Sequence, residues 1–226
     1  RRYYDDMAGV YRDMAVTGIG RMACGVEAAA DIRLSYRWRL SLAASAGRYK
    51  YARDPVVTVI SDVDNSAVDM RAVSRMGGCE TGGAPQLTAA AELAWFGTKG
   101  WGCRASAGFA GRRFVELMPL RRTDRIAGQA GITHEAFDAF TRQERLADAF
   151  TLDASFFKTV RFDRSRLTAA LMLRNLLGDA DTPYGGYESL RVRRIRPGDD
   201  TLYTPHATRY TYAWPRSFYL TISYRF

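Results

Sequence analysis

Lysine, histidine and cysteine are scarce in this sequence, and it has no long uncharged hydrophobic run. The chain has three cysteines and two histidines in 226 residues. The cysteines have neither metal-ligand nor disulfide-framework spacing, and His134 and His206 lie far apart in the sequence. We therefore expect no metal site. A helix that spans a bilayer needs about 20 apolar residues, so no transmembrane helix is expected either.

The same scarcity argues against an enzyme. A nucleophile needs a base within reach, and neither histidine lies on a predicted strand. The glycine pairs Gly82-Gly83 and Gly185-Gly186 do not lead from a strand into a helix, so no phosphate-binding loop is expected. We predict no catalytic residue and no cofactor. Asp62 and Asp64 could bind calcium in a loop, but a solvated charged loop is the simpler interpretation.

The positive charge is almost entirely arginine. Lysine and arginine number 33 against 24 acidic residues, which gives a formal net charge of +9. Such a balance fits nucleic acid, anionic lipid or an acidic ligand. The arginine pairs lie outside the apolar segments and no basic helix face is present. We therefore predict no nucleic-acid partner, with the charges distributed over loops and a solvated strand face.

The dominant pattern is an alternation of apolar and polar residues, which places every second side chain on one face of a strand. In 87–95, for example, leucine, alanine and tryptophan at odd positions alternate with mainly polar residues. Seven segments show this pattern and predict strands: 21–34, 39–51, 84–96, 101–116, 149–162, 167–177 and 208–226. The polar face of these strands should carry Glu27, Asp31, Arg33, Glu92, Arg104, Asp153 and Arg174.

The connections between these strands alternate strictly in length. Short turns are predicted at 35–38, 97–100 and 163–166, and long segments at 52–83, 117–148 and 178–207, with a short helix within 133–147. Outer-membrane barrels sort their connections in this way, with short periplasmic turns and long extracellular loops. The sequence thus predicts an all-β fold: part of an antiparallel transmembrane β-barrel of about seven meandering strands.

The last segment carries the most specific local pattern. Its final nine residues are close to the roughly 9–11 that cross a bilayer as a tilted strand. Aromatic residues flank its apolar stripe, as expected at lipid–water interfaces. A terminal phenylalanine preceded by apolar residues at every second position resembles the signal read by the barrel-assembly machinery. The residues of this stripe are Phe218, Leu220, Ile222, Tyr224 and Phe226. The C-terminus is then expected in the periplasm.

Several short motifs, taken in order, resemble one family. The chain is similar to the C-terminal third of a TonB-dependent outer-membrane receptor, of the kind that bears a carboxypeptidase-regulatory domain and is related to SusC-like importers. The motifs that carry the resemblance are Tyr4-Asp5-Asp6, Thr17-Gly18-Ile19, Gly25-Val26-Glu27, Gly47-Arg48-Tyr49-Lys50-Tyr51, Gly83-Ala84-Pro85-Gln86, Arg121-Arg122-Thr123, Leu152-Asp153, Arg174-Asn175-Leu176-Leu177 and Tyr184-Gly185-Gly186-Tyr187-Glu188.

The resemblance implies a function and a set of partners. Such receptors import a large, scarce solute, such as a glycan or a metal chelate, through a barrel of about 22 strands that encloses a plug. The implied partners are outer-membrane lipid, the receptor's own plug, the TonB complex, the barrel-assembly machinery and, in some members, a surface lipoprotein. Residues 1–226 would form one segment of the barrel domain, with the plug and earlier strands upstream, because an odd strand count is unusual for a bacterial barrel.

Aromatic residues near the end of the chain are candidates for ligand contact in the outer loops. They could stack on a sugar or a chelate, although interfacial anchoring and loop packing explain them equally well. These candidates are the aromatic residues Tyr184, Tyr187, Tyr210, Tyr212 and Trp214, together with the neighbouring Glu188.

Three other functions stay open. A small complete outer-membrane barrel with a structural or adhesion role would need an eighth strand, expected within 187–193. A barrel enzyme would need a nucleophile and base, and a soluble basic β-protein would bind nucleic acid in a salt-sensitive way.

Overall fold

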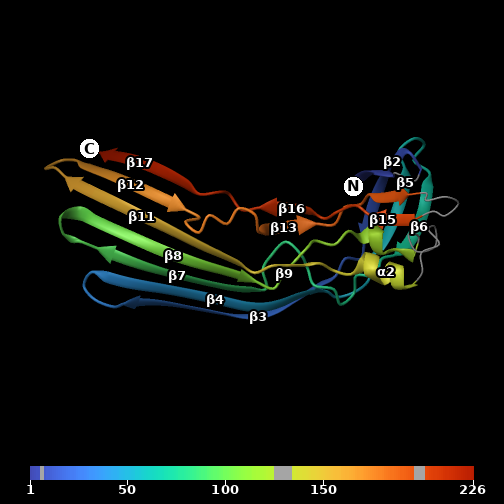
Figure 1. The fold of residues 1–226 in the computed structure, drawn as a ribbon, viewed down its shortest axis with the longest axis horizontal. Coiled ribbons are helices and arrows are strands. Elements are labelled where there is room, and N and C mark those ends of the chain that lie inside the picture. The colour runs from blue at the N-terminus through green and yellow to red at the C-terminus, as the bar shows by residue number, and fades with distance from the viewer. Residues whose placement is uncertain (6–7, 125–133, 196–201) are drawn as a thin grey trace.

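The computed structural model describes residues 1–5, 8–124, 134–195 and 202–226. The protein is all-β, and its paired strands run antiparallel apart from one isolated parallel bridge between Glu116 and Tyr187. The molecule is elongated, with a long sheet at one end and a smaller sheet at the other (Figure 1). None of the described helices is long and apolar enough to cross a membrane.

The larger sheet has seven strands, and all seven were predicted. In spatial order they are β17 (Ser217–Arg225), β12 (Arg166–Arg174), β11 (Ala149–Arg161), β8 (Trp101–Gly111), β7 (Leu87–Phe96), β4 (Trp38–Tyr51) and β3 (Arg21–Arg33). This order is the order of the sequence, so the sheet is a meander. It ends at β3 on one side and β17 on the other, so both of these are edge strands.

Some predicted strands are shorter than expected, each for a local reason. Strand β8 ends at Gly111 because Arg112 has a positive φ of 50°, and β12 ends at Arg174 because Asn175 has a φ of 52°. The last predicted strand, 208–226, is divided into β16 (Arg209–Tyr212) and β17, with Pro215 in the gap. Proline has no N–H to donate to a ladder.

The predicted sorting of the connections is confirmed. The β3–β4, β7–β8 and β11–β12 turns lie at the end of the sheet that also holds the C-terminus (Figure 1). The β7–β8 turn contains the short helix η1 (Thr98–Gly100). We call this end of the sheet the turn end. The long connections all leave from the opposite end.

The long segments also form strands, which the sequence did not predict. Strands β5 (Val56–Ser61) and β6 (Ala67–Val73) join β1 (Arg2–Asp5) and β2 (Val10–Thr17) in a second sheet of order β1-β2-β5-β6. Three ribbons pair β9 (Arg113–Phe114) with β10 (Arg145–Leu146), β13 (Pro183–Tyr187) with β16, and β14 (Val192–Ile195) with β15 (Leu202–Pro205). The expected helix is α2 (His134–Thr141). A further short helix, η2 (Pro119–Arg122), follows β9.

We call these segments outside the seven-stranded sheet the loop lobe. Its β13–β16 and β14–β15 ribbons do not join the seven-stranded sheet. In the described part of the chain, the large sheet therefore lacks the eighth strand that a small complete barrel would need.

The hydrophobic core lies mainly in the loop lobe. One buried cluster contains Tyr3, Met14, Val57, Val59, Met118 and Leu120, from the small sheet and η2. A second cluster contains Tyr51, Met76 and Leu117, where β4 enters the lobe. The large sheet instead leaves most of its apolar side chains exposed. This distribution is the reverse of a soluble sandwich, in which the sheet faces form the core.

Candidate functional site

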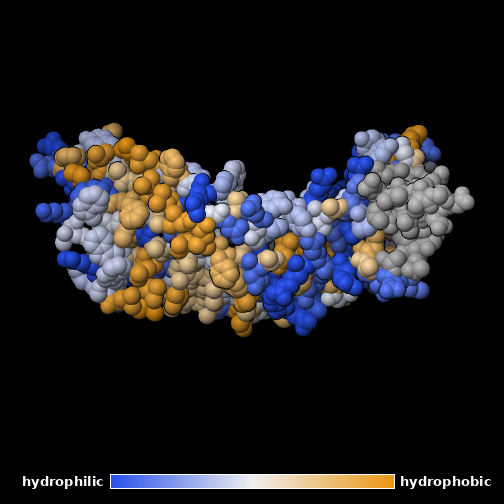
Figure 2. Space-filling model, in the orientation of Figure 1, coloured by the Kyte–Doolittle hydropathy of each residue, from blue (hydrophilic) through white to orange (hydrophobic). Residues whose placement is uncertain are grey.

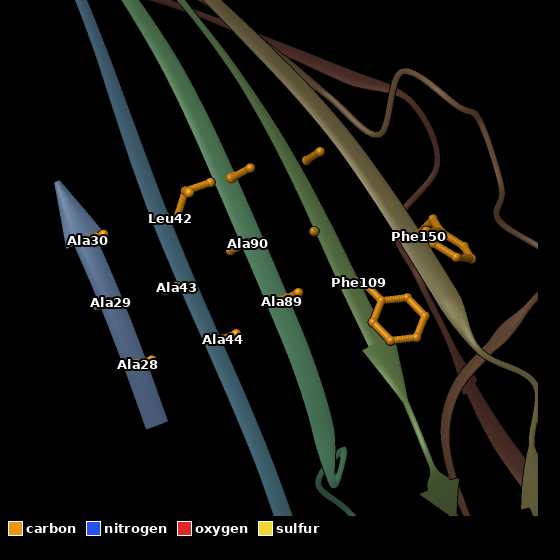
Figure 3. Close-up of a pocket in the computed structure, with 13 residues that line it drawn as sticks. Ala28, Ala29, Ala30, Leu42, Ala43, Ala44, Ala89, Ala90, Phe109 and Phe150 are labelled. Carbon is orange, nitrogen blue, oxygen red and sulfur yellow. The ribbon is translucent and has the colours of Figure 1, made fainter. Parts of the chain in front are cut away.

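The register of the seven-stranded sheet separates its side chains into two faces. Ala28 lies opposite Ala44, Ala44 opposite Ala89, Ala89 opposite Phe109, and Phe109 opposite Phe150. These residues come from β3, β4, β7, β8 and β11, and Figure 3 shows them in a row across the sheet. We call this side the apolar face and the other side the polar face. The alternation predicted for each strand thus combines into one continuous apolar surface.

The apolar face is open to the surroundings. Val26 on one edge strand is 72% exposed, and Leu220 and Ile222 on the other are 65% and 67% exposed. Figure 2 shows hydrophobic side chains gathered over this sheet and hydrophilic ones over the middle of the molecule. A contiguous apolar surface of this extent on a folded protein marks contact with a membrane or a partner.

The side chains of the apolar face are small in one half of the sheet and large in the other. Strands β3, β4, β7 and β8 carry mostly alanine near their middle, while β11, β12 and β17 carry leucine, isoleucine and phenylalanine. The small side chains leave a shallow hollow of about 600 Å³ bounded by Phe109 and Phe150 (Figure 3). The sheet is thin there, because Ala29, Ala43 and Ala90 line the opposite face.

Aromatic side chains mark both ends of the apolar face. Trp38 and Trp95 are neighbours at the turn end, with ring centroids 6.5 Å apart. Phe109 and Phe150 lie at the other end, with centroids 4.9 Å apart. From Trp101 to Phe109 along β8 is about 26 Å at 3.3 Å per residue.

The polar face carries the seven charged residues predicted for it, and several of them are paired. The Arg104 guanidinium lies 3.8 Å from the Glu92 carboxylate on the neighbouring strand. Asp31 accepts a hydrogen bond from the Ser41 hydroxyl at 3.4 Å. Asp153 accepts one from the Asn175 backbone N–H at 2.8 Å. The Arg104–Glu92 and Asp31–Ser41 contacts are exposed cross-strand pairs, as suits a solvated surface, whereas the Asp153–Asn175 contact is partly buried.

The residues predicted as an assembly signal form a single stripe on β17. Phe218, Leu220, Ile222 and Tyr224 lie on the apolar face, opposite Leu173, Leu171, Ala169 and Leu167 of β12. Phe226 follows the strand and is fully exposed, with its ring 6.2 Å from that of Tyr224. The stripe is therefore intact and accessible along an edge of the sheet.

The candidate outer-loop contacts divide into two groups. Tyr184, Tyr187, Tyr212 and Trp214 are exposed on or beside the β13–β16 ribbon. Tyr210 and Glu188 are held by other side chains. The Tyr210 hydroxyl donates to Glu144, and this hydrogen bond raises the pKa of the phenol. Glu188 is buried in an ion pair with Arg122. The four exposed rings are thus the members of the set that an external molecule can reach.

The ion pair between Arg122 and Glu188 is a feature that the sequence did not reveal. Its guanidinium also donates to the Thr141 carbonyl at 2.7 Å, and Glu188 accepts from the Met118 N–H at 2.9 Å. The Ser74 hydroxyl donates to the Pro119 carbonyl at 2.6 Å beside it. All three long segments therefore meet at this point. The Arg122 charge belongs to the Arg121-Arg122-Thr123 motif, and the Glu188 charge belongs to the Tyr184–Glu188 motif.

The remaining reactive residues do not form a centre. Among the described residues, no group of histidine, cysteine and carboxylate side chains could hold a metal ion. His134 begins α2 and His206 lies between β15 and β16. All three cysteines are free, and burial raises the pKa of the Cys79 thiol. Comparison of the chain with protein families, curated proteins and solved structures finds no match.

Proposed function

We propose that this chain forms part of the barrel wall of a TonB-dependent outer-membrane receptor that imports a large, scarce solute. One observation carries the proposal: a seven-stranded antiparallel meander has one apolar and exposed face, one polar face, and short turns at one end only. A wall between lipid and a water-filled interior needs these three properties together.

In this proposal, further strands complete the wall at the two edges of the sheet. Unpaired backbone groups cost several kcal/mol each in the hydrocarbon of a bilayer, so a closed sheet is needed there, whereas the edges of an open sheet in a detergent micelle can reach water. Strands β3 and β17 are edges of the described sheet. In the proposed receptor they pair with the remaining strands of the larger barrel, and the polar face lines the interior around the plug.

The loop lobe is the part that would meet the solute. It lies at the end of the sheet opposite the short turns (Figure 1), which is the extracellular end in this orientation. Its exposed aromatic rings, Tyr184, Tyr187, Tyr212 and Trp214, could stack on a glycan or a chelate. Capture there would precede rearrangement of the plug by the TonB complex.

A pair of substitutions on adjacent residues tests whether the apolar face contacts hydrocarbon. Ala107 lies between Ala91 and Leu152 on that face, while Ser106 lies between Glu92 and Asp153 on the other. Arginine on the lipid side costs about 2–4 kcal/mol near the bilayer midplane. Ala107→Arg should prevent refolding into detergent micelles, monitored by circular dichroism, and Ser106→Arg should not.

A second measurement addresses the environment directly. Detergent with brominated tails should quench the tryptophan fluorescence of the folded chain, because Trp38, Trp95 and Trp101 border the apolar face. A chain that folds as a monodisperse protein without detergent, and tolerates both substitutions equally, would disprove the proposal.

A further inference from the structure

A notch at the turn end of the sheet is not explained by the proposed wall. It lies where the β11–β12 hairpin extends further than the neighbouring β7–β8 hairpin, so that β11 continues beyond its last pair with β8, Lys158 with Trp101. The notch has a volume of about 820 Å³. Gly100 lies close to β11 at this point, because an added Cβ would be only 2.1 Å from the Thr159 carbonyl oxygen.

The charged side chains that line the notch are all cationic. They are Lys99 in the turn, Lys158 and Arg161 on β11, and Arg166 on β12. No carboxylate lines it, and Asp163 in the adjacent turn is not among the lining residues. Within the described part of the chain, none of the four cations forms an ion pair. Arg161 and Arg166 lie directly opposite each other, where like charges are unfavourable without an anion.

Aromatic rings surround these cations. Lys158 lies over the Trp101 ring, 4.6 Å from its centroid, and donates to the Lys99 carbonyl at 2.7 Å. Both contacts hold the Lys158 ammonium at the turn end rather than over the apolar face. Phe96, Phe157 and Tyr36 complete the wall. Trp101, Lys158 and Val160 belong to the apolar face, whereas Phe157, Arg161 and Arg166 belong to the polar face. The notch therefore lies between the two hairpin ends and opens onto both faces, including the surface proposed to contact hydrocarbon.

We propose that this notch binds the phosphate headgroup of an anionic lipid. The phosphate would lie within the notch, beyond the last β8–β11 pair, where Lys99 lines it from the turn and Arg161 and Arg166 line it from the polar side. The acyl chains would leave the notch along the apolar face beside Trp101. The inference rests on the proposed membrane insertion, because only an embedded sheet presents this edge to headgroups. Basic residues near an anionic membrane surface each contribute about 1 kcal/mol, which corresponds to about a five-fold change in affinity.

The test uses Trp101 as a reporter. The other three tryptophans, Trp38, Trp95 and Trp214, are replaced by phenylalanine in the full chain, which is then refolded in detergent. Phosphatidylglycerol or phosphatidylcholine, brominated on the acyl chain near the headgroup, is titrated into the micelles. We expect phosphatidylglycerol to quench Trp101 at a concentration at least about five-fold lower than phosphatidylcholine.

A triple variant and a matched control identify the site. Lys99→Gln/Arg161→Gln/Arg166→Gln should abolish the preference for phosphatidylglycerol. Arg53→Gln/Arg71→Gln/Arg142→Gln removes the same charge from the loop lobe and should leave the preference unchanged. Excess inorganic phosphate should not displace the lipid. If it does, the notch is a site for free phosphate and the lipid assignment is wrong.

The two proposals fail in different ways. Equal quenching by both lipids would overturn the headgroup site and leave the membrane-embedded wall standing. If neither lipid quenches Trp101 while the chain is folded, the apolar face does not contact hydrocarbon, and both proposals are wrong.

Discussion

Arg122 and Glu188 form a bidentate ion pair in which the two side chains are only 1% and 3% exposed. The two residues are 66 positions apart and belong to different long segments. Because each charge is removed from water, each depends on the other for compensation. This pair therefore determines how the segments of the loop lobe meet above the sheet.

Removing one partner should destabilise the lobe strongly. Glu188→Gln keeps the shape of the side chain but leaves the Arg122 charge buried without its counterion, at a cost of about 3–5 kcal/mol. Urea unfolding, followed by limited proteolysis of the lobe, should detect this loss. Asp124→Asn is the control, since it breaks the exposed contact of Asp124 with Arg75 and should cost under about 1 kcal/mol. Equal losses in the two variants would contradict the role given to the buried pair.

The Cys79 thiol should react slowly with alkylating reagents because it is partly buried in the loop lobe. It packs beside the cluster of Tyr51, Met76 and Leu117, and burial raises its pKa above the ordinary value. The thiolate is the reactive form. The pH at which the alkylation rate of Cys79 increases should therefore be higher for the folded chain than for the chain unfolded in urea. Because the raised pKa favours the neutral thiol, its contribution to stability is present below the unfolded pKa and is lost as pH rises through the folded pKa.

The measurement uses a Cys24→Ser/Cys103→Ser background, so that iodoacetamide reports on Cys79 alone. Glu188→Gln should shift the rate profile toward that of the unfolded chain, because Cys79 lies in the electrostatic field of Arg122 and Glu188 in the same lobe. A folded profile that coincides with the urea profile would show that the thiol is not buried.

The seven strands of the large sheet could be predicted because each has one face on an apolar surface and one on a polar surface. In β8, Trp101, Cys103 and Ala105 alternate with Gly102 and Arg104. That alternation is a local property of the chain, so the sequence contains it directly. The two faces of each strand and the positions of the turns followed from it, whereas the register is known only from the structure.

The small sheet was missed because its strands lack that alternation. Strand β5 reads Val-Val-Thr-Val-Ile-Ser, with Val57 and Val59 fully buried and their neighbours half-buried. A short apolar run of this kind does not distinguish a strand from other buried structure. The Arg122–Glu188 pair could not be predicted either, because it depends on how segments distant in sequence meet.

Gly100 should be the least replaceable glycine of the short turns. Its φ is +78°, and an added Cβ would lie 2.1 Å from the Thr159 carbonyl oxygen. Gly18 has a similar φ of +74° but nothing within 4 Å of its Cβ position. Gly18→Ala should therefore cost about 1 kcal/mol for the backbone conformation alone. Gly100→Ala should cost clearly more in the same urea titration, since the carbonyl must also move. Equal costs would mean that the turn can shift away from β11.

The stripe on β17 should affect assembly more than stability. Phe226 is fully exposed and lies beyond the last paired residue of its strand, Arg225. Its removal therefore leaves no cavity, and Phe226→Ala should refold in detergent with an unchanged urea midpoint. In cells, we expect the same variant to be depleted from the outer membrane and degraded in the periplasm, because a terminal aromatic residue belongs to the proposed assembly signal. Ser223→Ala, on the polar face of the same strand, is the matched control and should reach the membrane normally. A Phe226→Ala chain that assembles as well as the control would mean that β17 is only the edge of a sheet.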